Sequence, residues 1–324
     1  MKILNIESKG YSDRARSALM DIAEYIEASP IDGKELQGLL GGVNVLMTRL
    51  KLRIDSEIIN AGKNIRAIAS TTTGLDHIDL KECESRGIRV IALTGEVELL
   101  RSVPATAELT WGLILSLTRK LPWAFSSTKS GEWTRDLFKG RDLANKTIGI
   151  LGMGRIGEKI ARYAQAFGMK VQAYDPFRNG WVGGVKRCEN LGALLKSSDV
   201  LSLHVPLTSE TEGMLSLGQI AQLPKGALLI NTSRGKIVNE QAVLMALEEN
   251  HLGGAALDVL SDELLQEREM FDKLRSYAVR NDNLILIPHM GGVSSESMQA
   301  TEYFIAEKIQ TFVSGQKLLS LPIG

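Results

Sequence analysis

The stretch Gly152-Met-Gly-Arg-Ile-Gly157 decides the fold of the central part of this chain. An apolar run, Lys146-Thr-Ile-Gly-Ile-Leu151, precedes it and predicts a buried strand, and apolar residues at helical spacing follow it. In dinucleotide-binding folds the first glycine permits the tight turn, the second admits a pyrophosphate to the backbone, and the third packs helix against strand. Free N–H groups at the helix start, here those of Arg155 and Ile156, favour the phosphate charges. The stretch therefore predicts a dinucleotide site.

The residues after this stretch strengthen that prediction. A second apolar strand, Lys170-Val-Gln-Ala-Tyr174, ends at Asp175. A carboxylate at about this distance from the glycines accepts hydrogen bonds from the adenosine ribose hydroxyls. A lone glycine motif is weak evidence, but strand, glycine turn, helix, strand and terminal acid in this order favour dinucleotide binding.

Length and composition limit the class of protein. A chain of 324 residues predicts two domains, and its 44% apolar content can fill two cores. Lysine plus arginine equals aspartate plus glutamate, 38 each, which gives no support to nucleic-acid or anionic-membrane binding. The start lacks the pattern of a signal peptide and no apolar run reaches transmembrane length. Cys83 and Cys188 form no metal-type cluster, so we expect no metal and two free thiols in a reducing cytoplasm.

Short apolar strands alternate with helical patterns along the whole chain, which predicts parallel sheets with helices on their faces. Before residue 100 we expect strands at Lys2–Ile6, Val43–Thr48, Ile65–Ser70 and Arg89–Ala92, and helices near Ser12–Ala28 and Asp55–Ala61. From residue 147 onward we expect six more strands, at Thr147–Leu151, Lys170–Tyr174, Val200–His204, Ala227–Asn231, Gly253–Leu257 and Leu284–Ile287. A helix that is apolar on most sides, from Thr106 to Arg119, should be buried in a domain junction or a subunit interface.

Three residues that can carry chemistry follow predicted strands of the second series: Arg234, Glu263 and His289. Open α/β sheets bind ligands at the carboxyl ends of their strands, so these side chains are expected at one cleft. A guanidinium can hold a carboxylate and polarise the adjacent carbonyl, and a histidine can exchange a hydroxyl proton near neutral pH. A carboxylate beside that histidine orients its ring.

Each of these residues also has a structural interpretation. Arg234 could be a surface arginine, and Glu263 lies in an acidic run that could be a solvated face; their joint placement at strand ends favours chemistry. Asp258 could contact the nicotinamide amide or be a turn residue after a strand. For His204 we favour a packing role, because Pro206 fixes its loop and no acid is near in sequence.

These residues resemble the D-isomer-specific 2-hydroxyacid dehydrogenase family. The matching blocks are Lys146–Gly157, His204-Val-Pro-Leu-Thr208, Asn231-Thr-Ser-Arg-Gly235, Ala256-Leu-Asp258 with Glu263, and Pro288-His-Met-Gly-Gly292. The N-terminal part matches more loosely, through Thr73-Gly-Leu-Asp-His-Ile-Asp79 and Glu57-Ile-Ile-Asn-Ala61. The resemblance implies an α/β protein of two doubly wound parallel-sheet lobes. These are a flavodoxin-like substrate-binding lobe of residues 1–101 and 290–324 and a Rossmann NAD-binding lobe of residues 102–289.

Residue by residue, the resemblance implies that Arg234 binds the substrate carboxylate and carbonyl, that His289 is the general acid/base, and that Glu263 orients it. Asp175 would select NAD. From the other lobe, Arg49 and the backbone near Thr73 and Gly74 would meet the substrate. Beyond the glycine loop, the implied cofactor contacts are Thr106, Val205, Pro206, Thr211, Thr232, Asp258 and Gly291.

The function implied is NAD-dependent interconversion of a D-2-hydroxy acid and its 2-oxo acid in the cytoplasm, by a homodimer that meets through the 106–119 helix region. Within the family the pattern most resembles phosphoglycerate dehydrogenases and hydroxypyruvate reductases, which offers 3-phosphoglycerate/phosphohydroxypyruvate or glycerate/hydroxypyruvate as substrates. A second interpretation stays open at this point. The same fold could serve an NAD(H)-sensing, corepressor-like binding protein.

Overall fold

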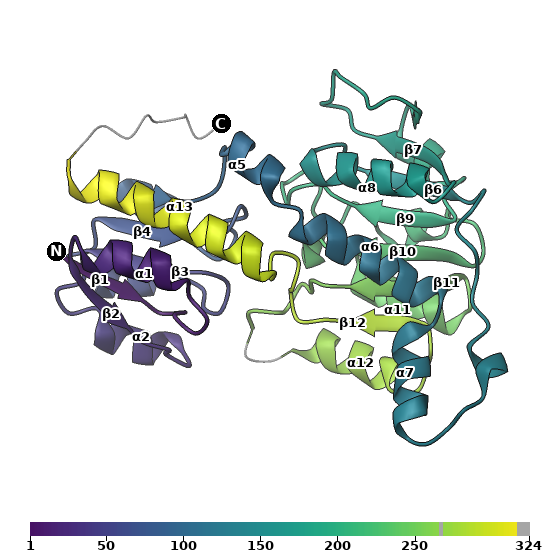
Figure 1. Cartoon of the computed structure of the whole chain (residues 1–324), viewed down its shortest axis with the longest axis horizontal. Coiled ribbons are helices and arrows are strands. Elements are labelled where there is room, and N and C mark those ends of the chain that lie inside the picture. The colour runs from purple at the N-terminus through teal and green to yellow at the C-terminus, as the bar shows by residue number, and fades with distance from the viewer. Residues whose placement is uncertain (266–267, 316–324) are drawn as a thin grey trace. The chain divides into compact units, whose positions relative to one another are not determined.

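The computed structural model describes residues 1–265 and 268–315 and divides into two compact units. The first unit contains Met1–Val103 together with the segment that begins at Ser294, and the second contains Pro104–Val293. Each unit has its own parallel sheet with helices on its faces (Figure 1). The α/β class and the two parallel sheets expected from the sequence are confirmed.

The sheet of the first unit has five strands in the order β2-β1-β3-β4-β5, all parallel. This order is the flavodoxin-like one, in which the strand sequence reverses between β1 and β3. The strands are β1 (Lys2–Asn5), β2 (Glu24–Glu27), β3 (Val45–Thr48), β4 (Ala67–Ser70) and β5 (Arg89–Ile91).

The helices of the first unit are α1 (Asp13–Met20), α2 (Gly33–Leu39), α3 (Ser56–Ala61), α4 (Leu80–Ser85), α5 (Val97–Ser102) and α13 (Ser295–Val313). Several begin at a side chain that accepts an N–H from the first turn, such as Ser12 at α1 and Asp55 at α3, which satisfies a donor that the helix itself leaves unpaired. The last helix, α13, packs against α1 and buries Ile305 and Ile309 in the same core as Ile3 (Figure 1).

One element of this unit was predicted wrongly. The helix expected near 12–28 ends at Met20, and Glu24–Glu27 form strand β2 instead. β2 is an edge strand whose first and last residues are exposed glutamates. The two apolar residues between them are too few to distinguish the apolar spacing of a strand from that of a helix.

The sheet of the second unit has seven parallel strands in the order β12-β11-β10-β9-β6-β7-β8. The six strands from β8 to β11 follow the Rossmann order, and β12 is one added strand at the edge. The direction of the strand order reverses between β6 and β9. The strands are β6 (Thr147–Leu151), β7 (Lys170–Tyr174), β8 (Val185–Arg187), β9 (Val200–Leu203), β10 (Ala227–Asn231), β11 (Leu252–Leu257) and β12 (Leu284–Leu286). The short edge strand β8 was not expected from the sequence.

The helices of the second unit are α6 (Ala105–Thr118), α7 (Leu121–Lys129), α8 (Arg155–Ala166), α9 (Leu191–Leu195), α10 (Leu217–Ile220), α11 (Glu240–Glu248) and α12 (Glu269–Ala278), with 3₁₀ turns η1 (Arg135–Phe138) and η2 (Gly235–Ile237). Helices α6 and α8 pack together on one face, where Trp111, Ile114 and Ile160 share a core with Ile150 of β6 (Figure 1). α11 packs with α10 and α12 in the other core, around Leu229 and Leu257.

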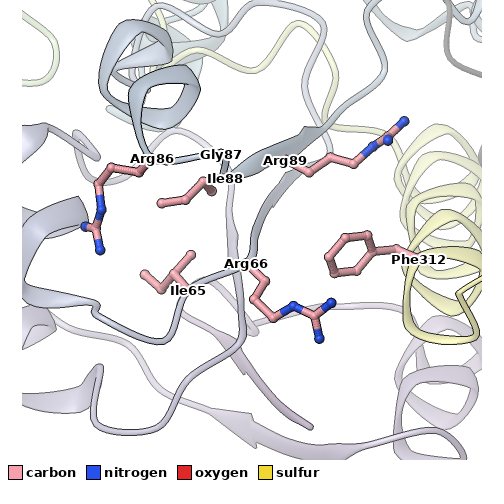
Figure 2. A pocket seen from close by; sticks show the side chains of 7 residues that line it. All are labelled: Ile65, Arg66, Arg86, Gly87, Ile88, Arg89 and Phe312. Carbon is pink, nitrogen blue, oxygen red and sulfur yellow. The ribbon is translucent and has the colours of Figure 1, made fainter.

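A shallow hollow of about 520 Å³ lies in the first unit, where the amino ends of β4 and β5 meet α13 (Figure 2). It is lined by Ile65, Arg66, Arg86, Gly87, Ile88, Arg89 and Phe312. Open α/β sheets bind their ligands at the opposite, carboxyl edge, so this hollow lies outside the candidate site. Within the described part of the chain, none of the helices has the length and apolarity that a membrane crossing requires.

Candidate active site

The glycine loop joins β6 to α8, and each glycine meets a different requirement. Gly152 has φ +90°, and a Cβ there would lie 2.6 Å from the backbone oxygen of His204. A Cβ on Gly157 would lie 2.2 Å from the backbone oxygen of Gly152, whereas one on Gly154 would meet no atom within 4 Å. The first and third glycines therefore allow close packing of backbone, and the second leaves open space beside the loop.

The start of α8 fits an anionic group. Its first residues, Arg155 and Ile156, follow Gly154 directly, so unpaired backbone N–H groups and the positive end of the helix lie at the loop. Nη1 of Arg155 is buried and has no hydrogen-bond partner among the described residues, and burial lowers the pKa of this guanidinium. A buried guanidinium nitrogen without a partner is costly, and a pyrophosphate would supply one.

Asp175 comes directly after β7, beside the glycine loop. Its Oδ2 accepts the N–H of Met153 at 2.9 Å, and its Oδ1 accepts the N–H of Phe177 at 3.0 Å. Each oxygen keeps a lone pair for a ribose hydroxyl. Arg178, the nearby cation that could attract a 2′-phosphate, is paired with Glu158. Because the Asp175 carboxylate can accept the ribose hydroxyls and Arg178 is already paired with Glu158, these residues favour NAD over NADP.

Arg234 lies in a loop that Asn231 shapes at the end of β10. Oδ1 of Asn231 accepts the N–H of Ser233 at 3.0 Å and its hydroxyl at 2.7 Å, while Nδ2 donates to the backbone oxygen of Arg234 at 2.9 Å. A Cβ on the next residue, Gly235, would lie 2.0 Å from the carbonyl carbon of Leu260. The Arg234 loop therefore packs directly on the loop that leads to Glu263.

Glu263 and His289 meet across the carboxyl ends of β11 and β12. Nδ1 of His289 lies 3.0 Å from Oε1 of Glu263, and both side chains are partly exposed, at 22% and 28%. Glu263 thus holds one ring nitrogen and leaves Nε2 for proton exchange with a ligand. Because β10, β11 and β12 are neighbours in the sheet, the three residues predicted from strand ends share one edge of this unit.

His289 has a strained backbone, with φ +51° in the left-handed region. The buried carboxylate of Asp258 holds this turn, because Oδ2 accepts the N–H of Gly291 at 2.8 Å and Oδ1 accepts the N–H of Met290. Burial raises the pKa of Asp258, and these N–H donors oppose the rise. In this structure Asp258 positions the His289 turn, and its contact with the nicotinamide amide stays a prediction.

Glu240 is a supporting residue that the sequence did not single out. It begins α11, is 5% exposed, and accepts the N–H and the hydroxyl of Ser261, each at 2.7 Å. These bonds fix the turn between Asp258 and Glu263. An acid in the first turn of a helix is ordinary, so no sequence signal distinguishes it.

The other predicted cofactor residues lie around the same edge of the second unit. The hydroxyls of Thr232 and Thr110 are 2.7 Å apart, and a Cβ on Gly291 would lie 3.4 Å from Thr106. The hydroxyl of Thr211 donates to the backbone oxygen of Pro206 at 2.6 Å, which closes the loop after β9. Val205 lies in the same loop after β9, and a Cβ on Gly152 would lie 2.9 Å from its side chain.

His204, at the end of β9, behaves as a packing residue. Its Nε2 lies 2.8 Å from the hydroxyl of Ser202, and burial lowers its pKa to about 3. The ring is therefore neutral at neutral pH. Its Nδ1 is buried and has no partner among the described residues.

Arg49, Thr73 and Gly74 all lie at the carboxyl edge of the first unit's sheet. Arg49 directly follows β3, and its guanidinium pairs with Glu302 of α13. The loop after β4 is held by hydrogen bonds from the Thr72 hydroxyl to the backbone oxygen of Gly74, at 2.8 Å, and from the Thr94 hydroxyl to that of Thr73, at 2.7 Å.

Comparison with known proteins agrees with this geometry. Residues 111–291 match the family model described as D-isomer specific 2-hydroxyacid dehydrogenase, NAD binding domain. The chain is 34% identical to a hydroxypyruvate reductase of Thermotoga maritima over 92% of its own length and 94% of that protein. It is 32% identical to a D-3-phosphoglycerate dehydrogenase of Methanocaldococcus jannaschii over 92% of its own length, but spans only 55% of that longer protein.

A solved structure shows the same architecture. The D-lactate dehydrogenase of Aquifex aeolicus, complexed with NAD and lactic acid, superposes with a TM-score of 0.84 at 28% identity, over 97% of this chain and 96% of that one. The second unit is thus the NAD-binding domain of an oxidoreductase. The chain belongs to the D-isomer specific 2-hydroxyacid dehydrogenase family.

Proposed function

We propose that this enzyme interconverts a D-2-hydroxy acid and its 2-oxo acid, with Arg234, Glu263 and His289 as its catalytic set. The observation that carries the proposal is the Glu263–His289 pair, 3.0 Å apart, at the same sheet edge as the Arg234 loop. The relatives named above act on hydroxypyruvate, 3-phosphoglycerate and lactate, which share a carboxylate next to the reacting carbon. Glycerate/hydroxypyruvate and 3-phosphoglycerate/phosphohydroxypyruvate are the candidate substrate pairs.

The roles follow from the chemistry of each side chain. NAD, when bound, accepts or supplies the hydride, and the glycine loop, the start of α8 and Asp175 would hold it. Arg234 binds the substrate carboxylate and polarises the reacting carbonyl. Nε2 of His289 takes the hydroxyl proton in oxidation and returns it in reduction, while Glu263 stabilises the imidazolium through Nδ1. In the first unit, the groups that we assign to the substrate are the main-chain amides near Thr73 and Gly74, with Arg49.

The test is NADH oxidation, followed at 340 nm, with a panel of 2-oxo acids. We expect turnover with at least one of hydroxypyruvate, phosphohydroxypyruvate and glyoxylate. His289→Ala should lower kcat by at least about a hundredfold, the scale of a lost general acid/base, with NADH binding retained. His251→Ala is the matched control, since His251 precedes β11 at the opposite edge of the same sheet and should keep wild-type turnover. NADH binding without turnover of any acid would instead favour an NAD(H)-sensing role.

We also propose a homodimer that forms through the region of α6. Most of α6 is buried within its own unit, but apolar side chains that follow it are exposed: Leu121, Phe125, Trp133 and Leu137. Large apolar side chains that are this exposed are typical of a surface covered by a partner. Light scattering should give twice the chain mass, and Phe125→Glu should halve it. The two buried free thiols, Cys83 and Cys188, support a location in the cytoplasm.

A further inference from the structure

A buried carboxylate in the first unit has no part in the mechanism above. Glu302 lies on α13 with its side chain 1% exposed, and its Oε1 pairs with the guanidinium of Arg49. Its Oε2 accepts the N–H of Ser12 at 2.6 Å. Burial raises the pKa of Glu302, and the N–H of Ser12 and the charge of Arg49 oppose that rise, so Arg49 is the paired counter-ion of this buried carboxylate.

The pair lies where a ligand of this unit would bind. The strand order of the sheet reverses between β1 and β3, and open α/β sheets take ligands at the carboxyl side of that point. Arg49 directly follows β3, and Glu7 lies two residues after β1. Oε1 of Glu7 accepts the N–H of Arg49 at 2.6 Å and that of Lys51 at 3.1 Å.

The side-chain charge of Arg49 is therefore already paired. Arg49 faces one fully buried carboxylate through its side chain and a second, Glu7, through its backbone. The ammonium of Lys51 is directed elsewhere, donating to the backbone oxygen of Pro30 at 2.8 Å. A phosphate brought to Arg49 would add about two negative charges beside Glu302, and moving Arg49 to the phosphate would leave Glu302 buried without its counter-ion.

We propose that Glu302 holds Arg49 in an internal ion pair and thereby restricts the enzyme to unphosphorylated 2-hydroxy and 2-oxo acids that carry one carboxylate. The inference rests on the proposed function, because it assigns the substrate class of that same site. Of the two candidate pairs it selects glycerate/hydroxypyruvate over 3-phosphoglycerate/phosphohydroxypyruvate. Glu302 is a positioning residue, acting on the substrate only through Arg49.

The test compares phosphorylated and unphosphorylated acids in the full-length enzyme. The readouts are kcat/KM for phosphohydroxypyruvate and hydroxypyruvate with NADH, and calorimetric binding of 3-phosphoglycerate and glycerate in the presence of NAD. The variants are Glu302→Gln, which keeps the shape and removes the charge, and Glu302→Asp, which keeps the charge. Glu24→Gln removes one charge at the amino end of the same sheet and is the control.

Wild type should prefer the unphosphorylated acid in both readouts. Glu302→Gln should shift the preference toward the phosphorylated acid by about tenfold or more, chiefly through KM, since one charge is removed beside a dianion. Glu302→Asp and Glu24→Gln should keep the wild-type preference. A wild type that prefers the phosphorylated acid would overturn the inference, as would a Glu302→Gln preference within about twofold of wild type. The binding readout keeps the two proposals apart, because an absence of turnover counts against the proposed function while the binding preference still reports on Glu302.

Discussion

Alanine at each of the three loop glycines should separate folding from cofactor binding. In Gly157→Ala the new methyl would lie 2.2 Å from the backbone oxygen of Gly152, far inside contact distance, so β6 and α8 must move apart. Such overpacking costs about 1–3 kcal/mol. Gly152→Ala adds left-handed backbone strain, φ +90°, to a clash 2.6 Å from the His204 oxygen, for about 2–5 kcal/mol in total.

Gly154→Ala should behave differently. Its methyl meets no protein atom within 4 Å and its φ is −73°, so the free energy of unfolding should change by less than about 1 kcal/mol. The methyl would instead occupy the space that lets a pyrophosphate approach the backbone. We expect NAD affinity to fall at least about tenfold, which corresponds to about 1.4 kcal/mol.

Two measurements check this series. Urea unfolding without cofactor, followed by tryptophan fluorescence, reports on the second unit, because all four tryptophans of the chain lie between residues 111 and 181. Calorimetry gives NAD affinity for each folded variant. The reasoning is refuted if Gly154→Ala unfolds as early as Gly157→Ala, or if it binds NAD as tightly as wild type.

Two further predictions concern single carboxylates. Asp175→Ala should narrow the preference for NADH over NADPH, and an unchanged ratio of kcat/KM for the two cofactors would count against the assignment of Asp175 to the ribose. Burial raises the pKa of Glu240 above its ordinary value of 4.5, so the stability it contributes is present at low pH and lost as pH rises through the folded-state pKa. The unfolding free energy of wild type minus that of Glu240→Gln should therefore fall as the pH rises above 4.5 in urea titrations, and a constant or rising difference would contradict the burial effect.

The second unit was more predictable than the first for a physical reason. The strands of the Rossmann sheet are buried on both faces, so Thr147–Leu151 and Ala227–Asn231 stand out as apolar runs and their limits match the structure. Edge strands lack that signal. Glu24–Glu27 and Val185–Arg187 each place charged residues beside one or two apolar ones, which is why one was assigned to a helix and the other was missed.

The candidate site shows the same limit. Arg234, Glu263 and His289 could be grouped because each follows a strand, a property that is local in sequence. Glu240 and Glu302 could not be assigned to the site from the sequence, because their partners lie 21 and 253 residues away along the chain. A buried acid of this kind looks like any solvated helix residue until the packing of its helix is known.

The first unit is built from two separate segments of the chain, and this affects the order in which the two units fold during synthesis. Its core needs Ile305, Ala306 and Ile309 of α13, all fully buried, yet these residues leave the ribosome only after the complete second unit has been translated. The first unit therefore cannot complete its core at this stage, and the apolar face of α1 and its sheet stays uncovered. The second unit can already fold. Vectorial synthesis thus places the lobe that begins the chain last in the order of folding, and chains truncated before α13 are expected to depend on chaperones or to aggregate.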